Sequence, residues 1–258
     1  MRTTVTLTLA LGFLASANAA TIVYQDTFDD GVLATNPGIG GGFSQDIAGG
    51  SGFTESGGSI DADTSTNNNR AYGYSTNSFD LSDGFLLEFT ASATNLGSTS
   101  ANRFAVGLAA AGADFAGTTT SGRNWLGSNL ALFEGVGVDF TTDAGSGGQG
   151  LSYNDGAGSV TVVTNAQTIT ASTDHAISLT VNADGSYSYS IDGATATTGA
   201  DFGLDLTKEY HFATYFQDNE GDFAINEVTL TALDPIPEPS TTALLGLGGL
   251  ALILRRRK

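Results

Sequence analysis

Residues 175–192 read HAISLTVNADGSYSYSID, and this stretch decides the fold class. Apolar and polar side chains alternate over 177–181 and again over 187–191. Such alternation puts one row of side chains in a core and the other row toward solvent. Asp184-Gly185 separates the two runs, and this dipeptide is typical of the tight turn of a β-hairpin. The stretch therefore predicts two antiparallel strands.

The same two-residue period recurs along the middle of the chain, where no segment has a convincing 3.6-residue helical stripe. The predicted strands lie near 21–28, 52–60, 69–75, 84–93, 102–110, 131–141, 150–154, 159–164, 175–183, 186–192, 209–217 and 223–233. So many antiparallel strands form two packed sheets or a barrel, and long glycine-rich connections such as 111–130 favour the sandwich. We predict an all-β, antiparallel, two-sheet sandwich over 20–234. The low-complexity segment 34–58 is predicted as a surface loop or a poorly ordered stretch.

The N-terminus carries an export signal. A basic start, an apolar stretch at 5–14 and the cleavage pattern Ala17-Asn18-Ala19 predict a signal peptide over 1–19. The mature chain then begins at Ala20.

The C-terminal tail, residues 235–258, has three parts. A proline-rich motif at 237–240 precedes an apolar stretch at 241–254 and a basic end at 255–258. The purely apolar twelve residues before the basic end cover only roughly 18 Å as a helix, whereas a bilayer core is about 30 Å thick. The terminal cations nevertheless favour a short transmembrane helix held on the cytoplasmic side. The alternative is a buried C-terminal helix of a soluble domain.

This tail closely resembles the PEP-CTERM protein-sorting tail of Gram-negative bacteria, and Pro237, Glu238 and Pro239 match its recognition motif. The resemblance implies processing at or near that motif by an exosortase, a membrane-embedded cysteine transpeptidase. The inner membrane is then a transient partner through the tail. The expected destination is the cell envelope, the outer surface or the extracellular matrix, because proteins with this tail commonly accompany exopolysaccharide production.

Charge is distributed unevenly along the chain, whose formal net charge is −18. The basic residues between 20 and 234 are Arg70, Arg103, Arg123 and Lys208. Against these four stand 26 acidic residues, so the predicted domain has a net charge of −22. Such a surface repels nucleic acid and anionic lipid, which excludes nucleic acid as a partner. The chain has no cysteine, so no disulfide stabilises it and no cysteine nucleophile is possible.

The order of the predicted strands resembles the concanavalin A-like lectin/glucanase jelly roll, which includes laminin-G-like domains. The resemblance spans nearly all of the predicted domain and lies in the patterns of 24–29, 84–90, 103–108, 175–192 and 223–230. It implies a jelly-roll sandwich whose first and last strands meet in one sheet. It also implies that a concave face or a loop rim binds glycans.

Signatures of hydrolytic enzymes are scarce. No G-x-S-x-G or H-E-x-x-H motif occurs, and two histidines cannot build a multi-histidine zinc site. A glycosidase needs two carboxylates about 5–10 Å apart. Jelly-roll glucanases are expected to place them in an alternating pattern on one strand. Glu134 and Asp139, five residues apart, point to opposite faces of a regular strand. We therefore predict a protein that is not an enzyme.

Acidic residues near both ends of the domain form a candidate calcium site. The candidate ligands are Asp26 and Asp29, near the first strand, and Asp218, Glu220 and Asp222, in a loop before the last strand. If these strands are neighbours, the carboxylates converge, and calcium takes six to eight oxygen ligands. The alternative is that these acids are solvated loop residues. The prediction is one structural calcium ion.

Sugar binding commonly uses an aromatic ring beside polar groups. Trp125, the only tryptophan, lies in a polar loop after Arg123 and Asn124. Its ring can stack on a pyranose while the two neighbours donate hydrogen bonds. The alternative is a tryptophan that folds back to cap the sandwich. Tyr72 and Tyr74 are candidates for a second site, although packing against a neighbouring strand is commoner.

The two histidines are expected to be structural. His211 lies in a predicted strand and is expected to pack or to form hydrogen bonds. His175 follows Asp174 at a strand start and is predicted as a surface turn residue.

These features together predict an exported, exosortase-processed surface or matrix protein that associates with glycan or exopolysaccharide without cleaving it. Two alternatives stay open. One is a glycan-cleaving enzyme of the lectin/glucanase fold, which a pair of carboxylates in a cleft would reveal. The other is a structural or adhesive matrix protein with no small ligand.

Overall fold

The computed structural model describes residues 20–35, 38–48, 52–62, 69–94, 103–113, 134–140, 150–156, 160–163, 169–194, 196–201, 203–218 and 222–233. Regular structure in these ranges consists of sixteen β-strands, without a helix. Every strand pairing is antiparallel. The predicted all-β, antiparallel fold is therefore confirmed. Residues Ala20–Leu233 form one compact unit.

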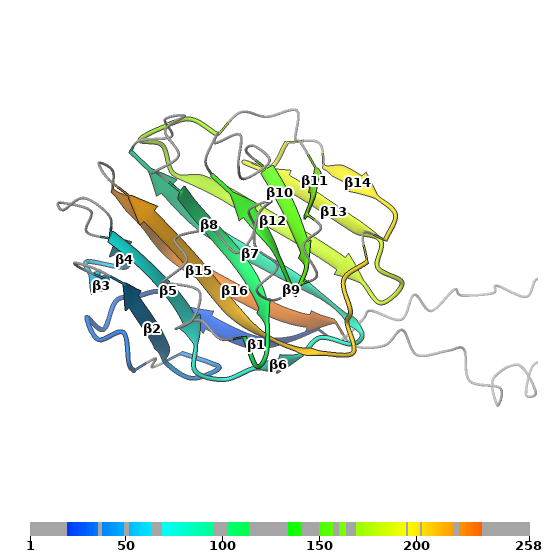
Figure 1. Ribbon diagram of the computed structural model, residues 1–258, viewed down its shortest axis with the longest axis horizontal. Helices are drawn as coiled ribbons and strands as arrows, with labels where there is room; N and C mark the ends of the chain where they lie inside the picture. Colours follow the sequence, from blue (N-terminus) through cyan, green and yellow to red (C-terminus); the bar gives the residue numbers. More distant parts are fainter. Residues whose placement is uncertain are drawn as a thin grey trace, which may run out of the picture. The chain divides into compact units, whose positions relative to one another are not determined.

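One sheet, called sheet A here, has eight strands in the order β14-β13-β12-β7-β16-β4-β3, and β1 also pairs with β16 (Figure 1). Its strands are β1 (Ala20–Asp26), β3 (Phe53–Ser56), β4 (Ser59–Ala62), β7 (Gly84–Ala93), β12 (His175–Asn182), β13 (Tyr187–Ile191), β14 (Thr197–Gly199) and β16 (Phe223–Leu233). The first and last strands pair from Ala20 opposite Leu233 to Asp26 opposite Val228. The expected meeting of the first and last strands in one sheet is confirmed.

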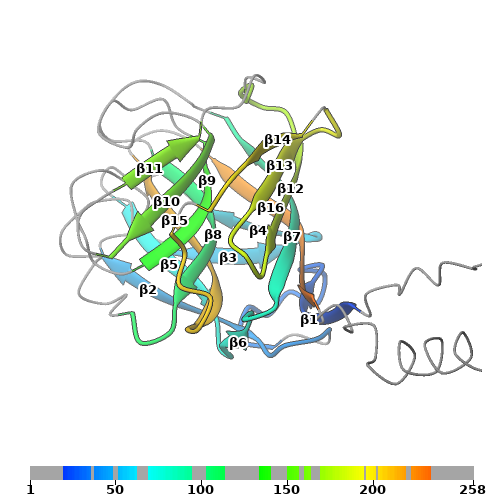
Figure 2. The same ribbon diagram turned by 90° about the vertical axis from the view of Figure 1, so that its right-hand side faces the viewer.

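The other sheet, sheet B, also has eight strands, in the order β11-β10-β9-β8-β15-β5-β2, with β6 paired to β15. Its strands are β2 (Phe43–Ala48), β5 (Asn69–Ser75), β6 (Phe79–Asp80), β8 (Arg103–Ala110), β9 (Glu134–Asp139), β10 (Gly150–Asp155), β11 (Val160–Val163) and β15 (Glu209–Asp218). Figure 2 shows the two sheets as separate layers. The predicted two-sheet sandwich is confirmed.

Aromatic rings from both sheets interlock in the core between the layers. The ring of Phe212 in β15 lies 5.4 Å from that of Tyr24 in β1 and 6.3 Å from that of Phe43 in β2. Further along the core, Phe104 in β8 stacks on Phe223 in β16 with 4.8 Å between ring centroids. All five side chains are almost completely buried. The alternation read from the sequence thus corresponds to a real inward-facing row on each strand.

The hairpin predicted for residues 175–192 is formed by β12 and β13, which pair from Ile177 opposite Ile191 to Val181 opposite Tyr187. Gly185 adopts a φ of +79°, which only glycine reaches without strain, and its N–H donates to the carbonyl of Asn182 at 2.8 Å. The tight turn between these strands is therefore confirmed.

The structure corrects the sequence prediction in the glycine-rich part. The predicted strand 52–60 is two strands, β3 and β4, joined by Gly57 and Gly58 at φ values of +63° and +89°. Strand β2 lies inside the segment predicted as a loop, and its pairing with β5 from Phe43 to Ala48 orders it. Two further short strands, β6 and β14, were not predicted because two or three residues cannot show an alternation.

Part of the outward side of sheet B is buried. A second buried cluster lies there, formed by Tyr72, Ala105, Ala109, Ala213 and Tyr215. The rings of Tyr72 and Tyr215 are 4.5 Å apart. Tyr74 donates a long hydrogen bond, 3.4 Å, to the carboxylate of Asp46. Cross-strand packing of Tyr72 and Tyr74, the commoner expectation, is what the structure shows.

Candidate functional site

The outward side of sheet A is polar. Along β7, Phe85, Leu87 and Phe89 are buried, while the alternating positions include the exposed Glu88 and the half-buried Thr90. The neighbouring strands continue this outward row with hydroxyl-bearing side chains. Because β12 and β16 flank β7 on either side, these polar side chains form one continuous surface across three strands.

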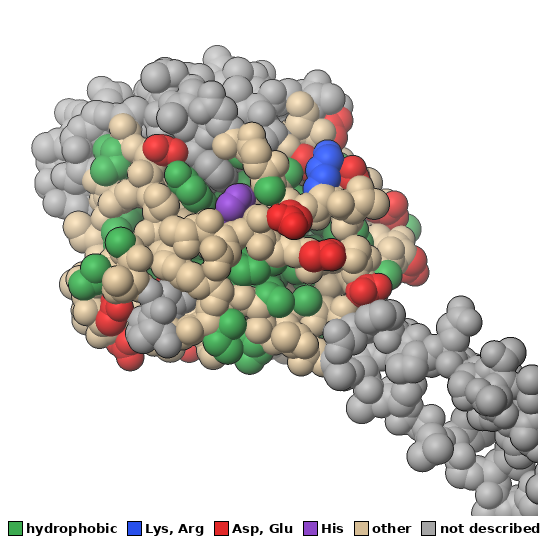
Figure 3. Space-filling view, turned by 90° about the horizontal axis from the view of Figure 1, so that it is seen from below, with side chains coloured by type: hydrophobic (Ala, Val, Ile, Leu, Met, Phe, Trp, Pro, Cys, Tyr) green, Lys and Arg blue, Asp and Glu red, His purple; other side chains and the backbone are tan. Residues whose placement is uncertain are grey.

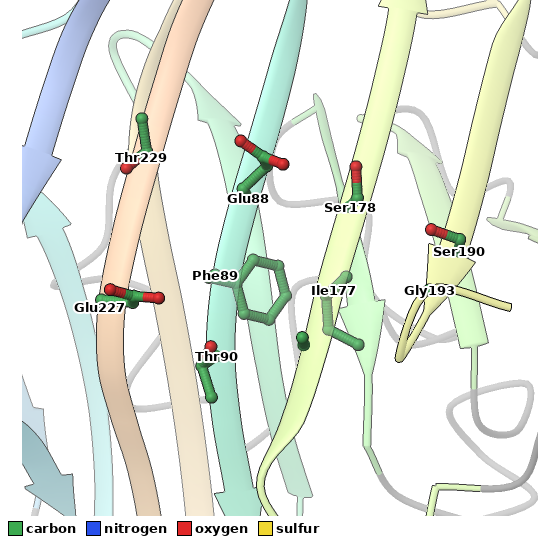
Figure 4. A pocket seen from close by; sticks show the side chains of 10 residues that line it. Glu88, Phe89, Thr90, Ile177, Ser178, Ser190, Gly193, Glu227 and Thr229 are labelled. Atoms are coloured by element: carbon green, nitrogen blue, oxygen red, sulfur yellow. The ribbon is translucent and has the colours of Figure 1, made fainter.

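A hollow of about 380 Å³ lies on this surface (Figure 4). We call it the sheet A groove, and its lining is Glu88, Phe89, Thr90, Ala176, Ile177, Ser178, Ser190, Gly193, Glu227 and Thr229. The lining comes from β7, β12, β13, β16 and the turn after β13. Both of its ionisable side chains are carboxylates, and its other polar side chains are hydroxyls.

The two carboxylates lie diagonally across adjoining strands. Glu88 is opposite Thr229, and Glu227 is opposite Thr90. Diagonal neighbours in an antiparallel pair have Cα atoms about 7–8 Å apart, within reach of long side chains. Figure 4 shows the two glutamates on the adjoining strands β7 and β16. This pair was not predicted from the sequence, because the two glutamates lie on different strands that are far apart along the chain.

A β-bulge turns Glu227 outward. Ile225 is opposite Ala91 and Glu227 is opposite Thr90, so Asn226 is an extra residue on β16. Without the bulge, Glu227 would share the buried side with Ile225. Bulges re-aim side chains and are frequent next to functional sites. The signal was in the sequence: the buried apolar positions step from Ile225 to Val228 and thereby break the two-residue period.

A second polar network surrounds Glu134, at the start of β9. Its buried carboxylate accepts hydrogen bonds from the Asp205 N–H at 2.6 Å, from the Tyr210 hydroxyl at 3.1 Å and from the Lys208 ammonium. Burial, followed by the charge of Glu134, raises the pKa of Tyr210 well above its usual range, and the hydrogen bond to Glu134 raises the pKa of Lys208. All these contacts fix Glu134 as a structural group.

Beside this network lies a smaller hollow of about 260 Å³, lined by residues that include Glu134, Asp155 and Lys208. Lys208 forms ion pairs with both Glu134 and Asp205. Its charge is thus neutralised within the protein. This leaves no cation of the hollow's lining to attract an anionic ligand. Acidic side chains outnumber basic ones over the described part of the side of the molecule shown in Figure 3.

The acids of the candidate calcium site are not gathered by the described residues. Asp26 is opposite Val228 on β16, whereas Asp222 precedes the first residue of that strand, roughly 20 Å away at the rise of a strand. Asp26 is buried, and its carboxylate accepts the Phe28 N–H at 2.9 Å. Burial, above all, raises the pKa of Asp26.

The other candidate ligands add no cluster. Asp29 is exposed after β1, and Asp218 ends β15. The side chain of Asp218 and the whole of Glu220 lie outside the described residues. Among the residues that the structure describes, no group of three or more acids or histidines could hold a metal ion. The described carboxylates therefore do not fit one calcium site, and calcium binding stays a prediction.

Two other groups of predicted residues lie outside the described ranges. They are Arg123, Asn124 and Trp125 of the candidate sugar-binding loop, and Pro237, Glu238 and Pro239 of the sorting motif. In the described part of the chain, no helix is long and apolar enough to cross a membrane.

His211 behaves as expected, because its Nδ1 lies 2.8 Å from the carbonyl oxygen of Ser75. The prediction for His175 was wrong: this side chain is buried, and its Nδ1 lies 2.8 Å from the Asp192 carboxylate. The Thr170 N–H donates to Nε2 at 3.0 Å. Asp192 lies far along the chain, beyond the hairpin, so the local sequence Asp174-His175 held no signal of this burial.

Replacing Asp192 with alanine should lower the free energy of unfolding by about 1–3 kcal/mol at pH 7, because it leaves the buried Nδ1–H of His175 without an acceptor. Burial alone would raise the pKa of Asp192, but hydrogen bonds from His175 and the Ala176 N–H outweigh it and lower the pKa. A carboxylate whose pKa is lower in the folded than in the unfolded state stabilises the fold at pH values above its unfolded-state pKa. This stabilisation is lost as the pH falls through the folded-state pKa. The deficit, measured by urea unfolding, should therefore shrink below about pH 4. An equal deficit at pH 7 and pH 3 would contradict this assignment.

Comparison with solved structures identifies the class of this sandwich as the concanavalin A-like, legume-lectin-like fold. The carbohydrate recognition domain of Emp47p matches at a TM-score of 0.56 with 15% identity, covering 84% of this chain and 98% of that one. The exoplasmic/lumenal domain of VIP36, in its Ca²⁺/Man3GlcNAc-bound form, matches at 0.55 with 9% identity, covering 78% and 87%. A structure associated with endo-acting O-glycanases that human gut microbiota express to initiate mucin breakdown matches at 0.56 with 12% identity, covering 83% and 100%.

The particular feature of this chain is its tail: residues 235–258 match the family model of the PEP-CTERM protein-sorting motif. The resemblance stated from the sequence is confirmed. The motif indicates a C-terminal transmembrane tail, export across the inner membrane and a surface or extracellular location after processing. Comparison with curated protein sequences gave no match.

Proposed function

We propose that this protein is an exosortase-processed component of the cell surface or extracellular matrix that binds glycan without cleaving it. The observation that carries the proposal is the sheet A groove on a lectin-like sandwich that bears a PEP-CTERM tail. Hydroxyls and carboxylates suit a polyhydroxylated ligand, because carboxylates accept and hydroxyls both donate and accept hydrogen bonds. The groove is open, so it can take a segment within a long polymer.

The loop that contains Trp125 is proposed as a second contact. Its ring would stack on a sugar face, with Arg123 and Asn124 as hydrogen-bond donors. Loops on a rigid scaffold commonly carry binding residues, which supports this proposal.

Hydrolysis is the second candidate function, and the pair of Glu88 and Glu227 favours it. Their diagonal arrangement, at about 7–8 Å between Cα atoms, allows the carboxylate separations that glycosidases use. Glycosidases, however, commonly enclose the reacting bond in a closed site that excludes water. Both side chains are exposed on an open sheet. We therefore favour binding over cleavage.

The groove is tested by filling it. Ser178→Tyr places a large ring in the groove and should weaken glycan binding about tenfold, a loss of about 1.4 kcal/mol. Thr180→Tyr is the matched control, because Thr180 lies on the same face of β12 but outside the groove lining and should leave affinity unchanged. Both affinities are measured by retardation in polysaccharide-containing gels.

The outcomes separate the two contacts. Normal glycan binding by Ser178→Tyr would exclude the groove as the binding site. Loss of glycan binding in Trp125→Ala alone would assign binding to the loop. Each measurement is made with calcium and with a chelator. Binding or thermal stability that falls in chelator would support the predicted structural calcium, and an unchanged melting temperature would remove it.

A further inference from the structure

The charge of the sheet A groove specifies its ligand further. Both of its ionisable lining residues, Glu88 and Glu227, are acids, and no Lys, Arg or His is in the lining. The two negative charges repel each other across adjoining strands, although their diagonal spacing and exposure to water keep the repulsion small. An acidic pair in the middle of a sheet is therefore a small cost to the fold.

The fold does not compensate for this cost. Neither the Glu88 nor the Glu227 carboxylate forms a hydrogen bond or an ion pair with any described residue. Acids elsewhere in the domain are used differently. Asp184 and Asp205 sit in turns, where they accept backbone N–H groups of residues two positions later. The pair in the groove has no such structural task, and glutamate is also a poor strand former.

The bulge in β16 determines that Glu227 faces the groove. It is the irregularity that brings Glu227 to the outward side, beside the diagonal Glu88. Without the bulge, β16 would point the charged side chain of Glu227 into the core. Since the same bulge returns Val228 and Leu230 to the core, the chain keeps its packing and presents the carboxylate to the groove.

We propose that the sheet A groove binds a polysaccharide that carries free amines, a partly de-N-acetylated amino-sugar polymer. This inference rests on the proposed glycan-binding function. The two carboxylates would each accept an ammonium group of the polymer, and the hydroxyls of Thr90, Ser178 and Thr229 would meet the sugar hydroxyls. Polyanionic polysaccharides are excluded, because the groove and the strongly acidic domain repel them alike.

The experiment compares three soluble polymers with the mature domain, residues 20–234: partly de-N-acetylated poly-glucosamine, its fully N-acetylated form and a neutral glucan. Retardation is measured at pH 6, where the glucosamine amines are charged, at low and high salt. We expect the first polymer to bind at least tenfold more tightly than the other two. Added salt should weaken its binding, because the attraction is between exposed charges.

The variant Glu88→Gln/Glu227→Gln keeps the size and hydrogen-bonding capacity of both side chains and removes their charge. We expect it to bind the de-N-acetylated polymer about tenfold more weakly. The control Asp83→Asn/Glu209→Gln removes the same charge from a turn and from sheet B. It should bind as the wild type does, which separates a groove effect from the net charge of the domain.

The possible failures are distinguishable. Equal binding of all three polymers, or equal loss in both double variants, would overturn the amino-sugar inference and leave glycan binding standing. No binding of any polymer would overturn the proposed function as well. Release of new reducing ends by the wild type, absent in Glu88→Gln/Glu227→Gln, would replace binding with hydrolysis.

Discussion

Phe212→Ala is expected to lower the free energy of unfolding by about 3–5 kcal/mol. Phe212 is completely buried in β15, and its ring contacts those of Tyr24 in β1 and Phe43 in β2. Removing the ring leaves a cavity where sheet A meets sheet B. For a domain of this size the melting temperature should fall by about 6–20 °C, since each kcal/mol shifts it by about 2–4 °C.

The control for this change is Ile47→Ala, which truncates an apolar side chain that is 46% exposed on β2. It should cost less than about 1 kcal/mol. Thermal and urea unfolding of the mature domain measure both variants. A cost below about 1 kcal/mol for Phe212→Ala would mean that the two sheets do not pack around this ring.

The second large effect concerns delivery. Replacing Pro237, Glu238 and Pro239 together with alanine should abolish processing of the tail and leave a chain that still carries residues 235–258 in the inner membrane. These residues match the recognition motif, and without recognition the apolar stretch 241–254 with its basic end keeps the chain membrane-bound. Cell fractionation and the mass of the recovered protein are the measurements.

The matched control is Thr241→Ala/Thr242→Ala, immediately after the motif. This variant should be processed and delivered normally. The exosortase assignment would fail if the motif variant were cleaved and delivered like the wild type. It would also fail if both variants were blocked equally, because the effect would then reflect a general disturbance of the tail.

The strand pattern could be predicted from the sequence because burial on one face of a strand leaves a two-residue period. The period is clear in long strands such as β7 and β12, and both were predicted. The period did not reveal β2, because this strand lies in a glycine-rich segment and is ordered by pairing with β5 rather than by its own pattern. Short strands such as β6 carry too few residues for a period.

The candidate site was harder to predict, because register rather than local sequence creates it. Glu88 and Glu227 are more than a hundred residues apart, and only the pairing of β7 with β16 makes them diagonal neighbours. His175 and Asp192 likewise meet through the β12–β13 hairpin. The break in alternation before Val228 was the one local signal that could have exposed Glu227.

The proposed function is that the mature domain binds glycan. The most direct test is retention of residues 20–234 on a panel of immobilised bacterial exopolysaccharides, with folding checked by circular dichroism. We expect retention on at least one polymer and its loss in Ser178→Tyr but not in Thr180→Tyr. No retention on any polymer by the folded domain would contradict the claim and favour a structural matrix protein with no small ligand.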